Sequence, residues 1–380
     1  MSATQVSKAE QLVTRKPVRP VVECPIWLGE DWFDEIIPLL AEMVDDHMAA
    51  LFVDQRVAEL YSDRLERLHQ ALPRVRQMEL NPRSAKTLAT YGKMVDFLLE
   101  HEVHHDDFLV SIGGGSILDI SGFAAATYTR GLNWISLPTT LIAQVDCGIG
   151  GKTSVDVGSH KNYLGTFYTP EVLLVDLSFL RTLPDNHYRG AIPEMAKMAL
   201  INNEPLFRKL AECTGEGRGI QGIRERELEL ARAVIQCKGE IIETDPYQRK
   251  TRVSLLTGHT TAHALESASN LNLPHGDAVA IGLAFESWIA EKRQLISPED
   301  RRLLVDTLEN CGLRTQLPGE LQDPVLIDCM RREKRNRGRT VGMVLPYKPG
   351  RAIEDWPAPY VQFSLEEVWN ELVSFRRKFG

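Results

Sequence analysis

Apolar and polar residues alternate along the first half of the chain in the rhythm of a βαβ protein. Residues 49–54 form an apolar, β-rich run, and residues 57–72 and 85–101 have the spacing of amphipathic helices, separated by a break at 81–84. Residues 106–138 then predict a buried strand, a glycine turn, a helix of small residues and a second strand. This alternation predicts an α/β fold with a parallel, doubly wound sheet.

The pattern changes after residue 184, where amphipathic stretches follow one another without a strand between them. Helices are expected at 194–213, 223–244, 257–270, 278–295 and 298–312. The chain is therefore predicted to have a flexible leader over 1–20, a Rossmann-like nucleotide-binding α/β domain over 21–185 and an all-helical metal and substrate domain over 186–380.

Composition narrows the class of protein. The 44 basic and 52 acidic residues give a net charge of −8, so no general field attracts nucleic acid. No apolar run approaches the roughly 18–20 residues that cross a bilayer, and the N-terminus has no apolar signal core, so a soluble cytoplasmic protein is expected. Six cysteines without a CxxC pair predict free thiols: Cys24, Cys147, Cys213, Cys237, Cys311 and Cys329.

Three glycines at positions 113–115 end the predicted strand and open the next helix, with Ser116 and Asp119 in its first turns. Glycine allows close backbone approach, and the free N–H groups of a helix start suit a pyrophosphate. Thr139 and Thr140 follow the next strand, at the edge where open α/β sheets bind ligands. These features favour nucleotide binding, although three glycines are also a common tight turn.

The helical half carries a candidate metal site. His259 and His263 are four residues apart, His275 follows, and Glu194 and Lys197 share a helix face. A carboxylate with two or three imidazoles suits Zn²⁺ with an open coordination position. The alternative is that the histidines cap or line a helical core. Lys152 follows two glycines after Asp146, where an ammonium group can meet a phosphate, although most lysines are solvated surface charges.

The ordered motifs resemble the 3-dehydroquinate synthase family of sugar phosphate cyclases over about residues 52–346. The matching segments are GGGSILDISGFAAATYTRG, LPTTLIAQVD, GGKTSVD, HKNYLGTFY, PEMAK, GHTTAHALE and PHGDAVAIGL. The resemblance implies a nucleotide-binding α/β domain, a helical metal domain, an active site between them, and usually a homodimer.

The resemblance also implies residue roles. The metal, usually Zn²⁺ or Co²⁺, would be held by Glu194, His259 and His275. NAD would contact Asp54, Lys86, Gly114, Gly115, Ser116, Asp119, Thr139, Thr140, Asp146, Lys161 and Thr182. The substrate would meet Lys152, Asn162 and His263 at its phosphate, Lys197 at its hydroxyls, Lys238 and Arg252 at a carboxylate, Lys334 in a closing loop, and Arg130 from the partner subunit. The catalytic set is Lys152, Lys197, Asp146 and His263.

The implied reaction begins with NAD oxidising a ring hydroxyl that the metal polarises, which acidifies the neighbouring C–H. Phosphate leaves by β-elimination, NADH returns the hydride, the ring opens, and an intramolecular aldol step closes a carbocycle. NAD is regenerated in each turnover, so this lyase needs no external oxidant.

Several departures from the family pattern fall near the substrate. Leu256 replaces an asparagine three residues before the metal histidine, and GGKTSVD places Ser154 and Asp156 where glycine and asparagine are usual. These changes favour a cyclitol synthase of secondary metabolism acting on sedoheptulose 7-phosphate. The retained Lys238 and Arg252 favour the alternative, 3-dehydroquinate synthase acting on 3-deoxy-D-arabino-heptulosonate 7-phosphate.

Two further functions are weighed. A metal-dependent polyol or alcohol dehydrogenase is suggested by GGGSILD, but such enzymes usually carry an aspartate followed four residues later by histidine, whereas here Glu194 precedes Lys197 and Met198. A binding protein without turnover is disfavoured by the intact site residues. Arg83 replaces a family glutamate near the cofactor and leaves open a preference for NADP.

Overall fold

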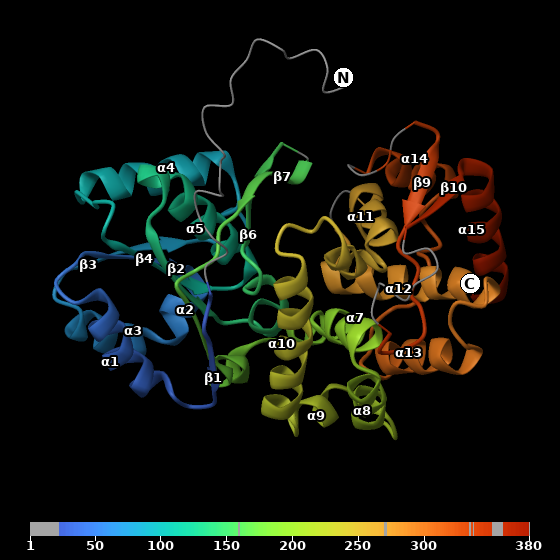
Figure 1. Cartoon of the computed structure of the whole chain (residues 1–380), viewed down its shortest axis with the longest axis horizontal. Helices are drawn as coiled ribbons and strands as arrows, with labels where there is room; N and C mark the ends of the chain where they lie inside the picture. The colour runs from blue at the N-terminus through green and yellow to red at the C-terminus, as the bar shows by residue number, and fades with distance from the viewer. Residues whose placement is uncertain are drawn as a thin grey trace, which may run out of the picture.

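The computed structural model describes residues 23–158, 160–269, 272–333, 336, 338–351 and 360–379. A sheet with helices on both faces forms the N-terminal half, and a helical half packs beside it (Figure 1). The predicted fold class is confirmed. The predicted leader over 1–20 lies outside the described residues.

Six parallel strands form the main sheet. Their order is β1 (Ile26–Gly29), β8 (Val172–Asp176), β5 (Asn133–Pro138), β4 (Phe108–Gly113), β2 (Ala49–Asp54) and β3 (Val75–Leu80). Strands β2 and β8 are buried along their whole length. Burial on both faces explains why these strands are continuously apolar instead of alternating with polar residues.

Alternate residues of β2 face two different cores. Leu51 and Val53 pack toward α1 (Phe33–Val44), α2 (Gln55–Leu60) and α3 (Ser62–Ala71). Ala50 and Phe52 pack toward α4 (Leu88–Glu100) and α5 (Gly115–Thr127) on the other face. The helix predicted over 57–72 is interrupted at Tyr61, where φ is −128°, so it forms two helices.

A β-hairpin of β6 (Lys152–Val157) and β7 (His160–Phe167) stands on α5, outside the main sheet. The hydrophobic pattern did not predict it, because β7 is exposed along its whole length. Short helical turns complete this half: η2 (Tyr128–Arg130), η3 (Ala143–Cys147) and η4 (Leu177–Thr182).

Helices dominate the second half, as predicted. They are α6 (Asp185–Arg189), α7 (Ile192–Asn202), α8 (Glu204–Thr214), α9 (Gly219–Arg224), α10 (Glu227–Thr244), η5 (Thr251–Leu256), α11 (His259–Ala268), α12 (His275–Lys292), α13 (Pro298–Asn310), α14 (Asp323–Arg332) and α15 (Leu365–Phe379). The helix predicted over 194–213 is divided at Asn203, whose side chain caps α8 by accepting from the Leu206 N–H. Two antiparallel strands, β9 (Thr340–Met343) and β10 (Val361–Ser364), also lie in this half, so it is mainly helical and not all-helical as predicted. Strands of four residues are too short to give a clear alternating pattern in the sequence. The predicted boundary at residue 185 stays a prediction.

Helices α11 and α12 pack at backbone contact. A Cβ atom on Gly282 would lie 2.0 Å from the carbonyl oxygen of Gly258, so only glycine fits there. Gly258 has a φ of 79°, in the left-handed region that favours glycine. Gly258 directly precedes α11, so this contact fixes the position of His259, the first residue of the helix.

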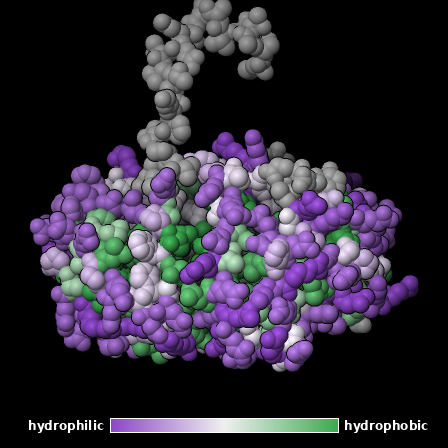
Figure 2. Space-filling model, turned by 60° about the horizontal axis from the view of Figure 1, so that its bottom comes forward, coloured by the Kyte–Doolittle hydropathy of each residue, from purple (hydrophilic) through white to green (hydrophobic). Residues whose placement is uncertain are grey.

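Figure 2 shows one face of the molecule, on which hydrophilic side chains predominate and apolar side chains form smaller groups between them. None of the described helices is long and apolar enough to cross a membrane. All six cysteines are free, as predicted.

Candidate active site

The three predicted metal ligands lie together. Glu194 is in the first turn of α7, and His259 and His275 are the first residues of α11 and α12. Their ligand atoms lie within 4.8 Å of one another, and Oε1 of Glu194 is 3.3 and 3.5 Å from the Nε2 atoms of His259 and His275. This Oε1 is buried and accepts no well-formed hydrogen bond from the described residues. One carboxylate oxygen and two imidazoles suit a divalent cation with an open coordination position.

Hydrogen bonds orient both imidazoles. Nδ1 of His259 donates to the carbonyl oxygen of Thr257 at 3.1 Å, which leaves Nε2 free for a ligand role. Nδ1 of His275 lies 3.5 Å from Oε1 of Glu266, a carboxylate that also accepts from Lys161 at 3.1 Å. Glu286 of α12 accepts from the Gly258 N–H at 2.6 Å and so secures the start of α11.

Charge and burial separate the pKa values of the two imidazoles. Burial, with Lys197 nearby, lowers the pKa of His259 to about 4. Burial alone would lower the pKa of His275, but Glu194 and Glu266 outweigh it and raise the pKa to about 10. Burial likewise opposes ionisation of Glu194, but Lys197 and His259 hold its pKa well below the usual range. A bound divalent cation would displace the His275 proton.

Replacing Glu266 by glutamine is expected to weaken Zn²⁺ binding by about 10- to 100-fold, because the variant loses the carboxylate that orients His275. Competition against a chromophoric chelator measures this affinity. The matched control is Glu291→Gln, which removes an ion pair with Arg301 elsewhere in the helical half and should leave metal affinity unchanged. Equal metal affinity in Glu266→Gln and the wild type would contradict this role.

His263 lies beside the metal cluster, which consists of the side chains of Glu194, His259 and His275, without joining it. Its ring centroid is 5.4 Å from that of His259, and its Nδ1 is 3.7 Å from Oε1 of Glu333. The structure therefore distinguishes the two histidines of the GHTTAH segment by the carboxylates that they face. His259 faces the carboxylate of Glu194, whereas His263 faces a different acid.

Lysines and carboxylates form pairs beside the metal cluster. Lys197 donates to Oε2 of Glu194, with side-chain exposures of only 2% and 1%. Lys238 donates to the carboxylate and the carbonyl oxygen of Asp146. Burial opposes ionisation of Asp146, but Lys238 lowers its pKa. These predicted site residues are therefore brought together as buried ion pairs.

Lys152 begins β6 close to the same charges. The residue is exposed, but its ammonium group lies near two other cations, Arg252 and Lys238. Desolvation, together with repulsion from these cations, lowers the pKa of Lys152 to about 7. The group therefore changes charge close to neutral pH.

Arg252 is placed differently from the expectation for a carboxylate-binding residue. Its side chain is 0% exposed, and its guanidinium donates to the carbonyl oxygens of Pro246 at 2.6 Å and Gly150 at 2.9 Å. Burial lowers its pKa to about 10. In this conformation the guanidinium is held by the protein's own backbone, and Leu256 nearby in sequence is also buried.

The glycine turn lies at the carboxyl ends of the central strands. Thr139 donates its N–H to the carbonyl oxygen of Gly113, and a Cβ atom on Gly114 would lie 3.1 Å from Thr140. Asp54 ends β2 beside Gly113, and burial raises its pKa. Ser116 lies in the first turn of α5, and Thr182, at the end of η4, hydrogen-bonds Tyr61 at 2.8 Å. Part of the predicted NAD set therefore lies at one edge of the sheet, namely Asp54, Gly114, Ser116, Thr139, Thr140 and Thr182.

A second polar cluster lies between α5 and the hairpin. Lys86 donates to Asp119 and to the side-chain oxygen of Asn162, which also accepts from Ser154 at 2.9 Å. Asn162 was expected at the substrate phosphate but here joins the predicted cofactor residues. Lys161, expected at NAD, here joins Glu266 beside the metal cluster.

Arg130, a predicted substrate residue, does not lie at the cluster. Arg130 is exposed at the far end of α5 from the glycine turn, roughly 20 Å away at the rise of a 13-residue helix. This position leaves its predicted role in a partner's site untested. Lys334 lies outside the described residues.

The sequence reasoning missed Glu266, Glu286 and Glu333. The first follows the metal histidine by seven residues in GHTTAHALE, so its place on the same helix face was available from spacing. Glu286 lies far along the chain from its partner Gly258, and Glu333 lies far from His263, so a single sequence gives no signal for those contacts.

Comparisons with known proteins agree with this geometry. Residues 78–190 match the family model for the 3-dehydroquinate synthase N-terminal domain, and residues 191–336 match that for the 3-dehydroquinate synthase C-terminal domain. The chain is similar to 3-dehydroquinate synthase from Streptococcus equi subsp. equi, with 31% identity covering 93% of this chain and 94% of the relative.

Two solved structures share the fold over nearly the whole chain. One is 2-epi-5-epi-valiolone synthase from Streptomyces hygroscopicus subsp. jinggangensis, solved with NAD⁺ and Zn²⁺, with a TM-score of 0.84, 26% identity, and coverage of 96% of this chain and 100% of that one. The other is 2-deoxy-scyllo-inosose synthase, solved with carbaglucose-6-phosphate, NAD⁺ and Co²⁺, with a TM-score of 0.80, 20% identity, and coverage of 93% and 96%.

Proposed function

Because the chain belongs to the 3-dehydroquinate synthase family, we propose that it is a sugar phosphate cyclase that uses NAD and a divalent metal, Zn²⁺ or Co²⁺. One observation carries this proposal: η3 packs against both α5, which follows the glycine turn, and α7, which carries Glu194. A Cβ atom on Gly115 would lie 3.3 Å from the sulfur of Cys147, and the neighbouring Asp146 lies close enough to Glu194 for their charges to interact. A hydride acceptor at the turn and a cation at the cluster would act on one substrate.

The residues present fit both cofactors. Glu194, His259 and His275 would hold the metal. The residues that follow the carboxyl ends of the strands, including Asp54, Thr139 and Thr182, would hold NAD. When bound, NAD supplies a reversible hydride acceptor and the cation polarises a ring hydroxyl.

The remaining chemistry falls to the chain's own cations. Lys197 and Lys238, each paired with a carboxylate, would orient the hydroxyls of the sugar ring. Lys152 and His263 would bind the phosphate and stabilise its charge as it leaves. The leaving phosphate would take up the C–H proton, since the described residues place only paired carboxylates beside the cations.

The proposed substrate is a seven-carbon ketose phosphate without a carboxylate, namely sedoheptulose 7-phosphate. Two features support this proposal: the fully buried Arg252, whose guanidinium is bound to Gly150 and Pro246, and Leu256 in place of an amide donor. Similarity to 2-epi-5-epi-valiolone synthase adds support. The product would be a cyclitol.

The second candidate is 3-dehydroquinate synthase activity on the carboxylated sugar. The identity of 31% to a curated 3-dehydroquinate synthase and the retained Lys238 and Arg252 favour it. It requires Arg252 to exchange its backbone partners for the substrate carboxylate. Homodimer formation, with Arg130 serving the partner's site, is proposed for either substrate.

Substrate choice is tested by measuring phosphate release with NAD and Zn²⁺ or Co²⁺ on sedoheptulose 7-phosphate, 3-deoxy-D-arabino-heptulosonate 7-phosphate and glucose 6-phosphate. The expected result is turnover of sedoheptulose 7-phosphate with a carbocyclic product by NMR. Turnover of the carboxylated sugar alone would overturn the substrate proposal and assign Arg252 to its carboxylate.

Activity is expected to fall as the pH rises above 7, because Lys152 has a pKa of about 7 and loses its charge there. A neutral amine attracts the substrate phosphate less, so kcat/KM should fall by up to about tenfold per pH unit. Lys152→Arg keeps its charge and should give a flatter profile between pH 7 and 9. Identical profile shapes for the variant and the wild type would contradict this role.

A further inference from the structure

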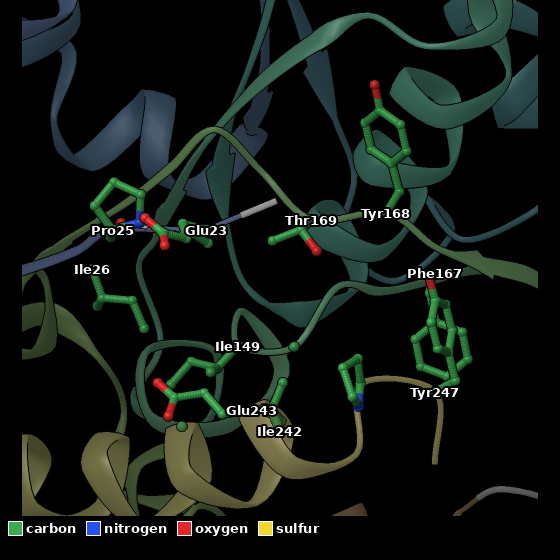
Figure 3. A pocket seen from close by; sticks show the side chains of 14 residues that line it. Glu23, Pro25, Ile26, Ile149, Phe167, Tyr168, Thr169, Ile242, Glu243 and Tyr247 are labelled. Atoms are coloured by element: carbon green, nitrogen blue, oxygen red, sulfur yellow. Dashed lines mark hydrogen bonds between the residues drawn. The ribbon is translucent and has the colours of Figure 1, made fainter. Parts of the chain in front are cut away.

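A pocket of about 590 Å³ lies outside the proposed active site. Four segments line it: the residues leading into β1, Ile149 and Gly150 after η3, the end of β7 with the loop after it, and the last turns of α10 with the residues that follow (Figure 3). Its volume is within the range of about 300–1,000 Å³ that small-molecule sites occupy. None of the cyclase residues named above lines it.

The pocket combines apolar walls with negative charge. Phe167 and Tyr247 form an edge-to-face aromatic pair with centroids 5.8 Å apart, and isoleucines including Ile242 add aliphatic surface. The ionisable lining groups are acidic, Glu23 and Glu243, apart from thiol and phenol groups; no lysine, arginine or histidine lines the pocket in the described chain. The two carboxylates attract a cation and disfavour an anion. Arg252 and Arg249 already lie over the rings of Phe167 and Tyr247, so these rings offer apolar contact to the body of an occupant and not a cation-binding face.

Arg252 lies behind the pocket wall, bound to residues that line the pocket. Two wall residues, Gly150 and Pro246, accept the hydrogen bonds of its guanidinium, which lies 5.3 Å from the ring centroid of Phe167. A third wall residue, Gly239, directly follows Lys238. Nε of Arg252 is buried without a hydrogen-bond partner among the described residues. The guanidinium is therefore held by groups that an occupant of the pocket would touch.

We infer that this pocket binds a small organic cation, a primary amine on an aromatic or branched aliphatic body, and that its occupancy regulates the active site by fixing Arg252. The binding part stands on the pocket alone, and the regulatory part rests on the proposed function. An occupant packed on Phe167 and Gly150 stabilises the conformation in which Arg252 is held by the backbone. It would therefore weaken binding of a carboxylated sugar phosphate, which needs Arg252 released from these carbonyl oxygens, and leave binding of sedoheptulose 7-phosphate unchanged.

The test for binding uses the full-length protein and 2-phenylethylamine as the probe, measured by isothermal titration calorimetry. 3-Phenylpropanoate and 2-phenylethanol are the anionic and neutral controls. Gly239→Phe fills the pocket, since a Cβ atom at this position meets nothing within 4 Å, and Glu243→Gln removes one wall charge. Glu229→Gln is the matched control, with the same charge change on the same helix outside the pocket.

The amine is expected to bind at least tenfold more tightly than either control compound. Gly239→Phe should abolish binding, Glu243→Gln should weaken it about tenfold, and Glu229→Gln should leave it unchanged. The assignment of this pocket would be overturned if the anion bound as tightly as the amine, or if Gly239→Phe bound the amine with unchanged affinity. It would also be overturned if the sugar phosphate displaced the amine equally from the wild type and from Gly239→Phe, because the amine would then occupy the active site.

Regulation is measured separately in the cyclase assay. Saturating amine should weaken binding of 3-deoxy-D-arabino-heptulosonate 7-phosphate by at least threefold in the wild type, measured as its KM or as its inhibition constant against sedoheptulose 7-phosphate. The amine should leave this constant unchanged in Gly239→Phe. Amine binding without a change in this constant in the wild type would overturn the regulatory part. Because calorimetry needs no turnover, a protein that binds the amine yet converts no sugar phosphate would refute the proposed function and leave the binding site standing.

Discussion

Replacing Glu194 by glutamine is expected to lower cyclase activity by at least about 10³-fold and to release the bound metal. Oε1 of this carboxylate faces both imidazoles of the cluster, so the variant loses the anionic ligand. It also leaves Lys197, only 2% exposed, without its ion-pair partner. Removing one partner of a buried pair costs about 3–5 kcal/mol, so the free energy of unfolding should fall as well. Metal analysis and denaturant unfolding measure the two effects.

A double variant separates these effects. Glu194→Gln with Lys197→Met removes both buried charges, so most of the lost stability should return while the metal and the activity stay absent. Full metal occupancy in the single variant would contradict the ligand assignment. Stability equal to that of the wild type in the single variant would contradict the importance of the buried pair.

Replacing Gly282 by alanine is expected to destabilise the protein by about 3 kcal/mol and to weaken metal binding. The new methyl group would lie 2.0 Å from the carbonyl oxygen of Gly258, and the two backbones must separate to admit it. Because His259 starts α11 directly after Gly258, this separation moves one metal ligand away from the other two. Denaturant unfolding and chelator competition are the measurements.

Gly239→Ala is the matched control, because its Cβ atom meets nothing within 4 Å and α10 should gain up to about 1 kcal/mol from the better helix former. If Gly282→Ala unfolded at the same denaturant concentration as the wild type, the close packing of α11 on α12 would not be what positions His259.

The sequence was sufficient to predict the layers of the fold and the metal cluster. Strands such as 49–54 are buried on both faces, and the resulting apolar runs are visible in the chain. Glu194 and His259 fall within the helices predicted over 194–213 and 257–270. His275 precedes the helix predicted over 278–295 and is instead the first residue of α12. The role of each ligand came from the family resemblance, because spacing left His263 as an equal candidate.

Long-range contacts could not be predicted from the pattern. Strand β7 of the hairpin is exposed along its whole length, so no apolar periodicity predicted the hairpin. The hairpin nevertheless positions Lys161 of the first half to donate to Glu266 of the second half. Arg252 matched a carboxylate-binding position, but its partners Gly150 and Pro246 are backbone carbonyls, which any sequence possesses. Such contacts depend on tertiary packing and not on residue type.

The most direct test of the cyclase proposal is the ratio of phosphate released to NADH accumulated during turnover of sedoheptulose 7-phosphate with NAD and Zn²⁺. A cyclase returns the hydride in each cycle, so many equivalents of phosphate per enzyme should appear with no net NADH. Stoichiometric NADH with no phosphate release would contradict the proposal and identify a dehydrogenase on the same fold.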